Sequence, residues 1–216
     1  MNYRYRKTLF PTYIYQYNLK GKNRVLKERL VPKIQACLDN FPSMDVITTG
    51  PPGWISDNVI TSWGRNEMNQ KLFVKPAEVK ECYADAFSKA LGLPGKESIL
   101  YGEAWYNYYV DGQYQEPHDH VNPEFNTPDP HYSVIHFLQF DKTRHRAVEF
   151  IDPNSKVNRR YITTDRYRPE IEEGDIIIFP SHLTHFVAPS EPTPDYPRIT
   201  VAFNINIQTG ENDQLY

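Results

Sequence analysis

From residue 99 onward, the sequence is a series of short β-type segments separated by turn residues. They cover residues 99–110, 132–140, 147–151, 160–171, 175–179, 184–187 and 198–207, with Gly, Pro, Asn or Asp between them. Several strands of this length in succession favour a sandwich or barrel over a helical bundle. The 16 tyrosines and 18 prolines among the 216 residues agree with strands joined by rigid turns.

The first hundred residues carry two helix patterns instead. Residues 23–38 have apolar side chains at roughly helical spacing, interrupted by Pro32. Residues 76–91 repeat apolar side chains at four-residue steps and stop before Gly92. Residues 49–71, between the two patterns, are expected to form a loop.

These patterns predict a mainly β protein with N-terminal helices. We expect a single domain over residues 1–216. Within it, residues 1–98 would form a helical and loop support region, and residues 99–208 a double-stranded β-helix (jelly-roll) catalytic core.

Charge and cysteine content argue against several classes of protein. The chain has 24 Lys and Arg against 27 Asp and Glu without a long basic run, so a nucleic-acid partner is not expected. Cys37 and Cys82 lie far apart in helix-like segments, which favours a reducing compartment over a disulfide scaffold. No stretch resembles a signal peptide or a membrane span. These observations predict a soluble cytoplasmic protein without a membrane partner.

Histidines supply a candidate metal site. His118 and His120 are two residues apart, so on an extended strand both imidazoles face the same side. His182 and His185 are three apart and would face opposite sides, so only one should join them; we favour His185, because it lies within an expected strand. Three ligands on one side of an ion leave positions open for small molecules, as in non-haem Fe(II) oxygenases. Alone, however, a pair at the spacing of His118 and His120 is more often a surface feature.

Three sequence blocks around these histidines strengthen the assignment. They are YVDGQYQEPH at residues 109–118, EGDIIIFPS at 173–181 and RITVAFNI at 198–205. Together, and in this order, they resemble the 2-oxoglutarate/Fe(II)-dependent dioxygenase superfamily, in particular its prolyl-4-hydroxylase-like and phage and bacterial branches. The resemblance covers roughly residues 100–207.

The resemblance implies an oxidoreductase that uses Fe(II), O2 and 2-oxoglutarate as co-substrate. Such an enzyme would hydroxylate a peptidyl or small-molecule substrate and release succinate and CO2; a peptide or free amino acid is preferred by family analogy alone. Ascorbate is a further candidate cofactor. The implied metal ligands are His118, His120 and His185.

The last block supplies candidate residues for the co-substrate. Family members typically hold the C5 carboxylate of 2-oxoglutarate with a basic residue on this strand, here Arg198. Arg198 and Thr200 share the polar face of the strand, where a guanidinium in a dry barrel requires an anion and its planar fork fits a carboxylate. A structural ion pair is the alternative for Arg198. Tyr109 and Asn107, on a shared strand face, are either pocket residues or ordinary core residues.

Two positions depart from the usual family pattern. The commonest motif is His-x-Asp followed by a distant His, whereas position 120 is histidine. Asp119 would point away on a regular strand, although a bulge could bring it to the metal in place of an imidazole. Relatives often have tyrosine where Phe137 stands, so Arg198 and Thr200 would contribute more to carboxylate recognition.

Two other kinds of protein remain alternatives. A three-histidine, cupin-like dioxygenase would share the metal ligands without using 2-oxoglutarate, and Arg198 with Thr200 argues against it. A non-enzymatic metal-binding module would gain stability from metal without forming succinate. The polar segment 122–131 beside the site is either a lid over the substrate or an ordinary surface loop.

Overall fold

Two antiparallel sheets form the framework of the protein. The computed structural model describes residues 12–40, 59–110, 112–121, 129–153 and 166–208. The larger sheet has the strand order β1-β8-β5-β10-β3-β2 and the smaller one the order β4-β9-β6-β7. The strands are β1 (Tyr15–Asn18), β2 (Ile60–Thr61), β3 (Ile99–Tyr109), β4 (Gln115–His118), β5 (Tyr132–Gln139), β6 (Val148–Ile151), β7 (Arg166–Tyr167), β8 (Asp175–Pro180), β9 (His185–Val187) and β10 (Arg198–Ile207).

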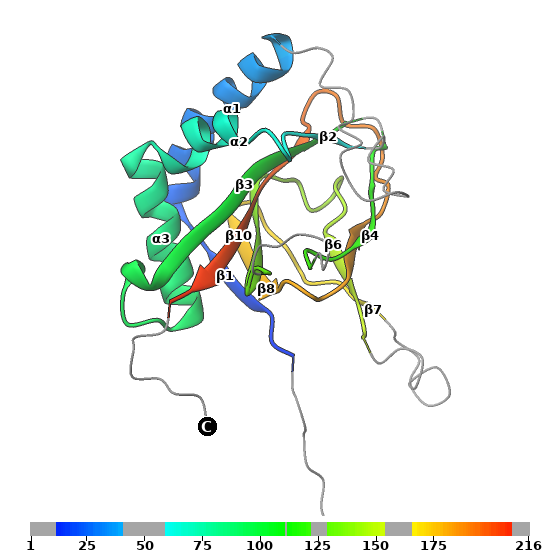
Figure 1. Cartoon of the computed structure of the whole chain (residues 1–216). Helices are drawn as coiled ribbons and strands as arrows, with labels where there is room; N and C mark the ends of the chain where they lie inside the picture. The colour runs from blue at the N-terminus through cyan, green and yellow to red at the C-terminus, as the bar shows by residue number, and fades with distance from the viewer. Residues whose placement is uncertain (1–11, 41–58, 111, 122–128, 154–165, 209–216) are drawn as a thin grey trace, which may run out of the picture.

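The helices cover the outer face of the larger sheet. Figure 1 shows α1 (Gly21–Asn40), α2 (Asn66–Asn69) and α3 (Ala77–Leu91) on one side of this sheet and β4, β6 and β7 on the other. Val201 and Phe203 of β10 belong to the buried cluster that contains the apolar residues of the helices. Phe137 and Phe179, which face the other way, belong to a second buried cluster that also includes residues of β6. The mainly β class with N-terminal helices is confirmed.

Several expected boundaries differ from those observed. Helix α1 begins at Gly21 and ends at Asn40, outside the expected 23–38, and it continues through Pro32 because Leu30 and Ile34 on either side are fully buried and hold the helix on the sheet. Residues 66–74, expected within or just after a loop, form α2 followed by a π-helical turn (Gln70–Val74) that buries Leu72 and Phe73. A short 3-10 turn (Lys96–Ser98) precedes β3.

The first hundred residues also contribute two strands that the sequence analysis did not predict. Strand β1 pairs with β8, and β2 pairs with β3. Both are short, so neither gives a clear alternation in the sequence. Of the expected strand at 160–171, the structure describes residues 166–171, and only Arg166–Tyr167 are extended and paired there. Residues 160–165 lie outside the described residues, as do residues 122–128 of the candidate lid.

A buried imidazole ties both long helices to the larger sheet. His136 of β5 is 0% exposed; its Nδ1 lies 2.8 Å from the Tyr83 hydroxyl of α3 and its Nε2 lies 2.9 Å from Asn23 Oδ1 of α1. The amide oxygen of Asn23 can only accept, so Nε2–H donates to it and Nδ1 accepts the tyrosine proton. The imidazole is therefore neutral, and its burial lowers the pKa of His136 to about 3.

This depressed pKa predicts an acid-dependent loss of stability. The unfolded imidazole takes up a proton near its ordinary pKa, about 6.5, whereas the folded one does so only near 3. His136 therefore contributes stability that is present above pH 6.5 and is lost as the pH falls towards 3. The substitution His136→Gln should lower the free energy of unfolding by about 1–3 kcal/mol at pH 7.5, because it disrupts two buried hydrogen bonds.

Urea unfolding of the metal-free wild type and His136→Gln, followed by circular dichroism at pH 7.5 and at pH 5, measures this contribution. The stability gap between the two proteins should narrow at pH 5. Other titrating groups cancel in the difference, so a gap of equal size at both pH values would contradict this account of His136.

Candidate functional site

Three imidazoles meet between the two sheets. One potential ligand atom from each of His118, His120 and His185 lies within 4.8 Å of the others. His118 ends β4 and is paired in register with His185 at the start of β9. The ring centroids of His118 and His185 are 4.2 Å apart, and that of His120 lies 5.4 Å and 5.1 Å from them. The arrangement could hold one metal ion.

Backbone carbonyls fix the tautomers of His118 and His185. The Nδ1 atom of His118 lies 2.7 Å from the Glu116 carbonyl oxygen, and that of His185 lies 3.0 Å from the Leu183 carbonyl oxygen. A carbonyl oxygen only accepts, so each Nδ1 carries the proton and each Nε2 is left unprotonated. Burial lowers the pKa of His118 to about 4 and that of His185 well below its ordinary value, so both rings are neutral at neutral pH.

A bend in the backbone brings His120 to the cluster. Strand β4 ends at His118, and the His120 backbone N–H donates to the Ser181 carbonyl at 2.9 Å. His118 and His120 were expected to face the same side because they alternate along one strand. Instead, the strand ends at His118, and a bend after it brings His120 to the cluster. Asp119 is exposed, and its Oδ1 accepts from the Val121 N–H at 3.1 Å. Neither Asp119 nor the exposed His182 joins the group.

The Arg198 guanidinium is buried on the face of the larger sheet that is turned away from the helices, and no described residue supplies it with an anion. Arg198 is 2% exposed, and its Cζ lies 4.3 Å from the ring centroid of Tyr109 and 5.5 Å from that of Phe137. Among the described residues, its Nε and Nη1 have no hydrogen-bond partner and no carboxylate forms an ion pair with it. Burial lowers the pKa of Arg198 because the charged form is desolvated. The structural ion pair considered as an alternative is absent from this part of the chain.

Two further candidates border Arg198. Thr200 is 1% exposed and paired in register with Asn107, which is 6% exposed. The Asn107 Oδ1 also lacks a partner among the described residues. Leaving a buried polar group unpaired costs about 1–3 kcal/mol, and a polar ligand that hydrogen-bonds to these atoms would remove that cost.

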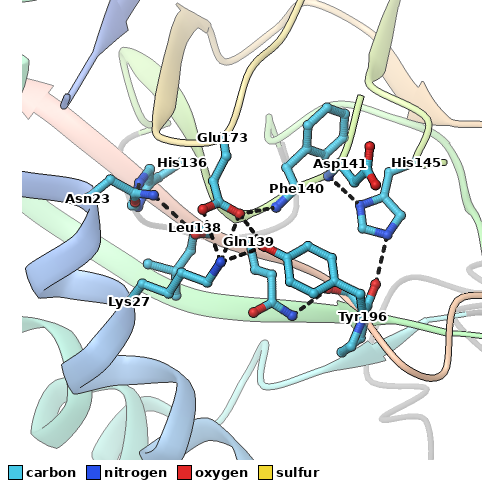
Figure 2. A network of polar contacts seen from close by, with 11 residues as sticks. Asn23, Lys27, His136, Leu138, Gln139, Phe140, Asp141, His145, Glu173 and Tyr196 are labelled. Carbon is cyan, nitrogen blue, oxygen red and sulfur yellow. Dashed lines mark hydrogen bonds and ion pairs between the residues drawn. The ribbon is translucent and has the colours of Figure 1, made fainter. Parts of the chain in front are cut away.

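The side chains of Gln139, in β5, and of His145, in the loop after β5, hold the backbone that leads into Arg198 (Figure 2). His145 Nδ1 accepts from the Asp141 N–H at 3.0 Å, so its Nε2–H donates to the Tyr196 carbonyl at 2.9 Å. Gln139 Nε2 donates to the Pro197 carbonyl, also at 2.9 Å. The two peptide carbonyls before Arg198 are thus both anchored.

Glu173 connects this anchor to helix α1 (Figure 2). Its carboxylate accepts from the Tyr196 hydroxyl at 2.7 Å, the Phe140 N–H at 3.0 Å and Lys27 Nζ at 2.9 Å. The donors hold the pKa of Glu173 below its usual value, although burial opposes them. No motif in the sequence indicates this anchor, because its members are scattered along the chain.

Comparison with protein families indicates which kind of enzyme this site belongs to. Residues 103–204 match the model of a family described as "Putative 2OG-Fe(II) oxygenase". The matched segment contains His118, His120, His185 and Arg198. The resemblance inferred from the three sequence blocks is confirmed, and the chain is a 2-oxoglutarate-dependent oxygenase, an oxidoreductase whose cofactors are Fe(II) and 2-oxoglutarate.

Solved structures share the fold at low sequence identity. A prolyl-4-hydroxylase from Pseudomonas putida is 13% identical with a TM-score of 0.51, over 91% of this chain and 93% of that one. The viral collagen prolyl hydroxylase of Paramecium Bursaria Chlorella virus-1, solved as a 2OG complex, is 14% identical with a TM-score of 0.54, over 89% and 95%. A Trichoplax adhaerens prolyl hydroxylase, solved with a hypoxia inducible factor peptide fragment, is 9% identical with a TM-score of 0.55, over 90% and 83%.

These structures confirm the jelly-roll core. No curated protein sequence matches the chain. Among the described residues, no helix is both long and apolar enough to cross a membrane.

The hydrogen bonds that hold the Tyr196 and Pro197 carbonyls lead to a prediction about co-substrate binding. The substitution Gln139→Leu removes the donor to the Pro197 carbonyl and so loosens the entry into β10. Because one neutral hydrogen bond contributes about 1 kcal/mol, we expect 2-oxoglutarate to bind about fivefold more weakly, with metal affinity unchanged. Calorimetric titration of Mn(II) and then of 2-oxoglutarate measures both affinities, and an equal loss in each would show that Gln139 only supports the fold.

Proposed function

We propose that the chain is a 2-oxoglutarate-dependent hydroxylase of a peptidyl or small-molecule substrate, releasing succinate and CO2. His118, His120 and His185 would hold Fe(II), and Arg198 with Thr200 would bind the C5 carboxylate of 2-oxoglutarate. The observation that carries this proposal is the buried Arg198 guanidinium, two of whose nitrogens lack a partner among the described residues. A planar carboxylate supplies two acceptors in the geometry that those nitrogens require.

The surroundings of Arg198 support a carboxylate over water alone. Desolvating a guanidinium without an anion is costly, so a site of this kind favours an anionic occupant. The rings of Tyr109 and Phe137 flank the guanidinium and confine it. The Tyr109 hydroxyl donates to Gln115 Oε1 at 3.1 Å, so it offers the pocket an acceptor; we propose that Tyr109 and Asn107 line the co-substrate site.

The metal group and Arg198 border one buried apolar cluster. Phe137 lies against Arg198, Phe179 lies against His185 with ring centroids 4.7 Å apart, and both phenylalanines belong to that cluster. One elongated dianion could therefore contact both groups inside the same dry interior. Three neutral imidazoles leave the charge of a bound Fe(II) uncompensated, which further favours a dianionic co-substrate.

These contacts indicate what the metal and the protein would each contribute to the reaction. Bound Fe(II), with 2-oxoglutarate and O2, supplies the oxidising chemistry. The protein orients the co-substrate through Arg198 and Thr200 and excludes water, since Arg198 and His185 are only 2% and 3% exposed. Ascorbate remains a proposed accessory reductant, and cytoplasmic location and a single domain remain predictions.

Replacement of Arg198 tests the proposal directly. Under anaerobic conditions, wild type with Fe(II) and 2-oxoglutarate should give the visible charge-transfer band of the chelated co-substrate. In Arg198→Ala, 2-oxoglutarate should bind about 10–100-fold more weakly, because a hydrogen bond to a charged group contributes about 1.5–3 kcal/mol. Fe(II) affinity should be unchanged.

Arg24→Ala is the matched control, because the Arg24 side chain is 81% exposed on α1. It should behave as wild type. Absence of the band in wild type at saturating concentrations would contradict the proposed function, and equal loss of Fe(II) and 2-oxoglutarate binding in Arg198→Ala would assign Arg198 to the fold.

Succinate release tests the hydroxylase activity. A set of peptides, free amino acids and other small molecules should include one that stimulates succinate formation above the uncoupled rate, with equimolar hydroxylated product by mass spectrometry. Steady O2 consumption independent of 2-oxoglutarate would instead support a three-histidine dioxygenase of the cupin type.

A further inference from the structure

A buried polar network surrounds the His120 side chain. The Nδ1 atom of His120 lies 2.7 Å from Asn204 Oδ1 and 2.8 Å from Ser133 Oγ. Ser133 Oγ also lies 3.0 Å from Ser181 Oγ and 3.1 Å from Asn204 Oδ1. Asn204, Ser133 and Ser181 are 9%, 0% and 1% exposed, so water competes little for these bonds.

His120 is oriented differently from the other two histidines. His118 and His185 each use the carbonyl oxygen of the residue two positions before them. The Asn204 partner of His120 lies 84 residues further along the chain, on β10. Its geometry is therefore set by the tertiary fold and not by its own segment.

We propose that Asn204 is a positioning residue that fixes the tautomer and direction of His120, and that this place is built for an imidazole and disfavours a carboxylate. The inference rests on the proposed function, because it concerns the second ligand of the same metal site. It also explains why histidine can stand where aspartate is usual in the family.

The hydrogen-bond donors and acceptors select one tautomer. The amide oxygen of Asn204 can only accept, so at 2.7 Å it requires the proton on Nδ1 of His120. The Ser133 hydroxyl can then donate to Ser181 or to Asn204, which completes the network. Protonation of Nε2 instead would bring the Nδ1 lone pair against the oxygen lone pairs of Asn204. The network thus keeps Nε2 unprotonated for a metal.

A carboxylate at position 120 would meet the wrong partners. The oxygens of an aspartate lie about where Nδ1 lies in histidine, one bond short of the position of Nε2. With the Asn204 amide oriented as it is here, where its Oδ1 accepts from the Ser133 hydroxyl, one oxygen would face Asn204 Oδ1, an acceptor opposite an acceptor. The Trp105 ring, whose centroid lies 5.5 Å from that of His120, confines the side chain on another side.

Two replacements of Asn204 separate hydrogen bonding from packing. Asn204→Leu keeps the branched shape and the number of heavy atoms without an acceptor, whereas Asn204→Asp keeps an acceptor at the same place. In the full-length, metal-free protein, nitrogen-15 NMR of the imidazoles should show the Nδ1–H form of His120 in wild type and in Asn204→Asp. Asn204→Leu should show a mixture of the two tautomers.

Metal affinity provides the second readout. Because loss of such an orienting partner typically weakens metal binding about 10–100-fold, Asn204→Leu should bind Mn(II) that much more weakly. Asn204→Asp should stay within a few-fold of wild type. An unchanged tautomer and affinity in Asn204→Leu would overturn the inference, as would equal losses in both variants.

A double-mutant cycle tests the preference for imidazole over carboxylate. His120→Asp should weaken Mn(II) binding, and adding Asn204→Leu to it should cause no further loss, because the opposing acceptor is then gone. Additive losses, or wild-type affinity in His120→Asp, would contradict the inference. Failure of this inference can be distinguished from failure of the proposed function. If wild type shows the 2-oxoglutarate band but the variants do not show the stated tautomers and Mn(II) affinities, only this inference fails. If wild type lacks the band, the proposed function fails.

Discussion

The site depends on strand β10, which is hydrogen-bonded between β3 and β5 in the larger sheet. The two faces of β10 contact different parts of the protein, because alternate side chains of a strand point to opposite sides. One face buries Val201 and Phe203 under the helices, where the hydrophobic effect holds the strand in place. The other carries Arg198 at one end and Asn204, which contacts His120, towards the other. A one-residue register shift in β10 would turn both side chains away from the histidines and towards the helices.

The buried charge of Arg198 imposes a cost on the fold that an occupant could offset. The surrounding structure contributes rings and a hydroxyl and, among the described residues, no carboxylate that pairs with it. Folded proteins usually pair such a charge, and exceptions concentrate at functional sites. The anchored carbonyls of Tyr196 and Pro197 keep this costly arrangement in place. In the proposed function, these hydrogen bonds hold an energetically unfavourable guanidinium in the position where the carboxylate of 2-oxoglutarate would bind.

Regular periodicity accounts for the parts of the fold that the sequence could predict. Strands β3, β5 and β10 are long and patterned, and the inward face of β10 followed from its alternation. Geometry that depends on tertiary contacts was not predictable in the same way. The turn of α2, the strand β1 and the bend that carries His120 leave no regular pattern over enough residues. The partners of His120 and of the Pro197 carbonyl come from distant segments, so no local spacing could indicate them.

In the proposed function, one co-substrate joins the three-histidine group to Arg198. A crystal structure of the protein grown anaerobically with Mn(II) and 2-oxoglutarate, with anomalous data collected for manganese, tests it most directly. We expect one anomalous peak bound by the Nε2 atoms of His118, His120 and His185, and a C5 carboxylate on Nε and Nη1 of Arg198. Manganese bound through Asp119, or 2-oxoglutarate bound without contact to Arg198, would contradict it.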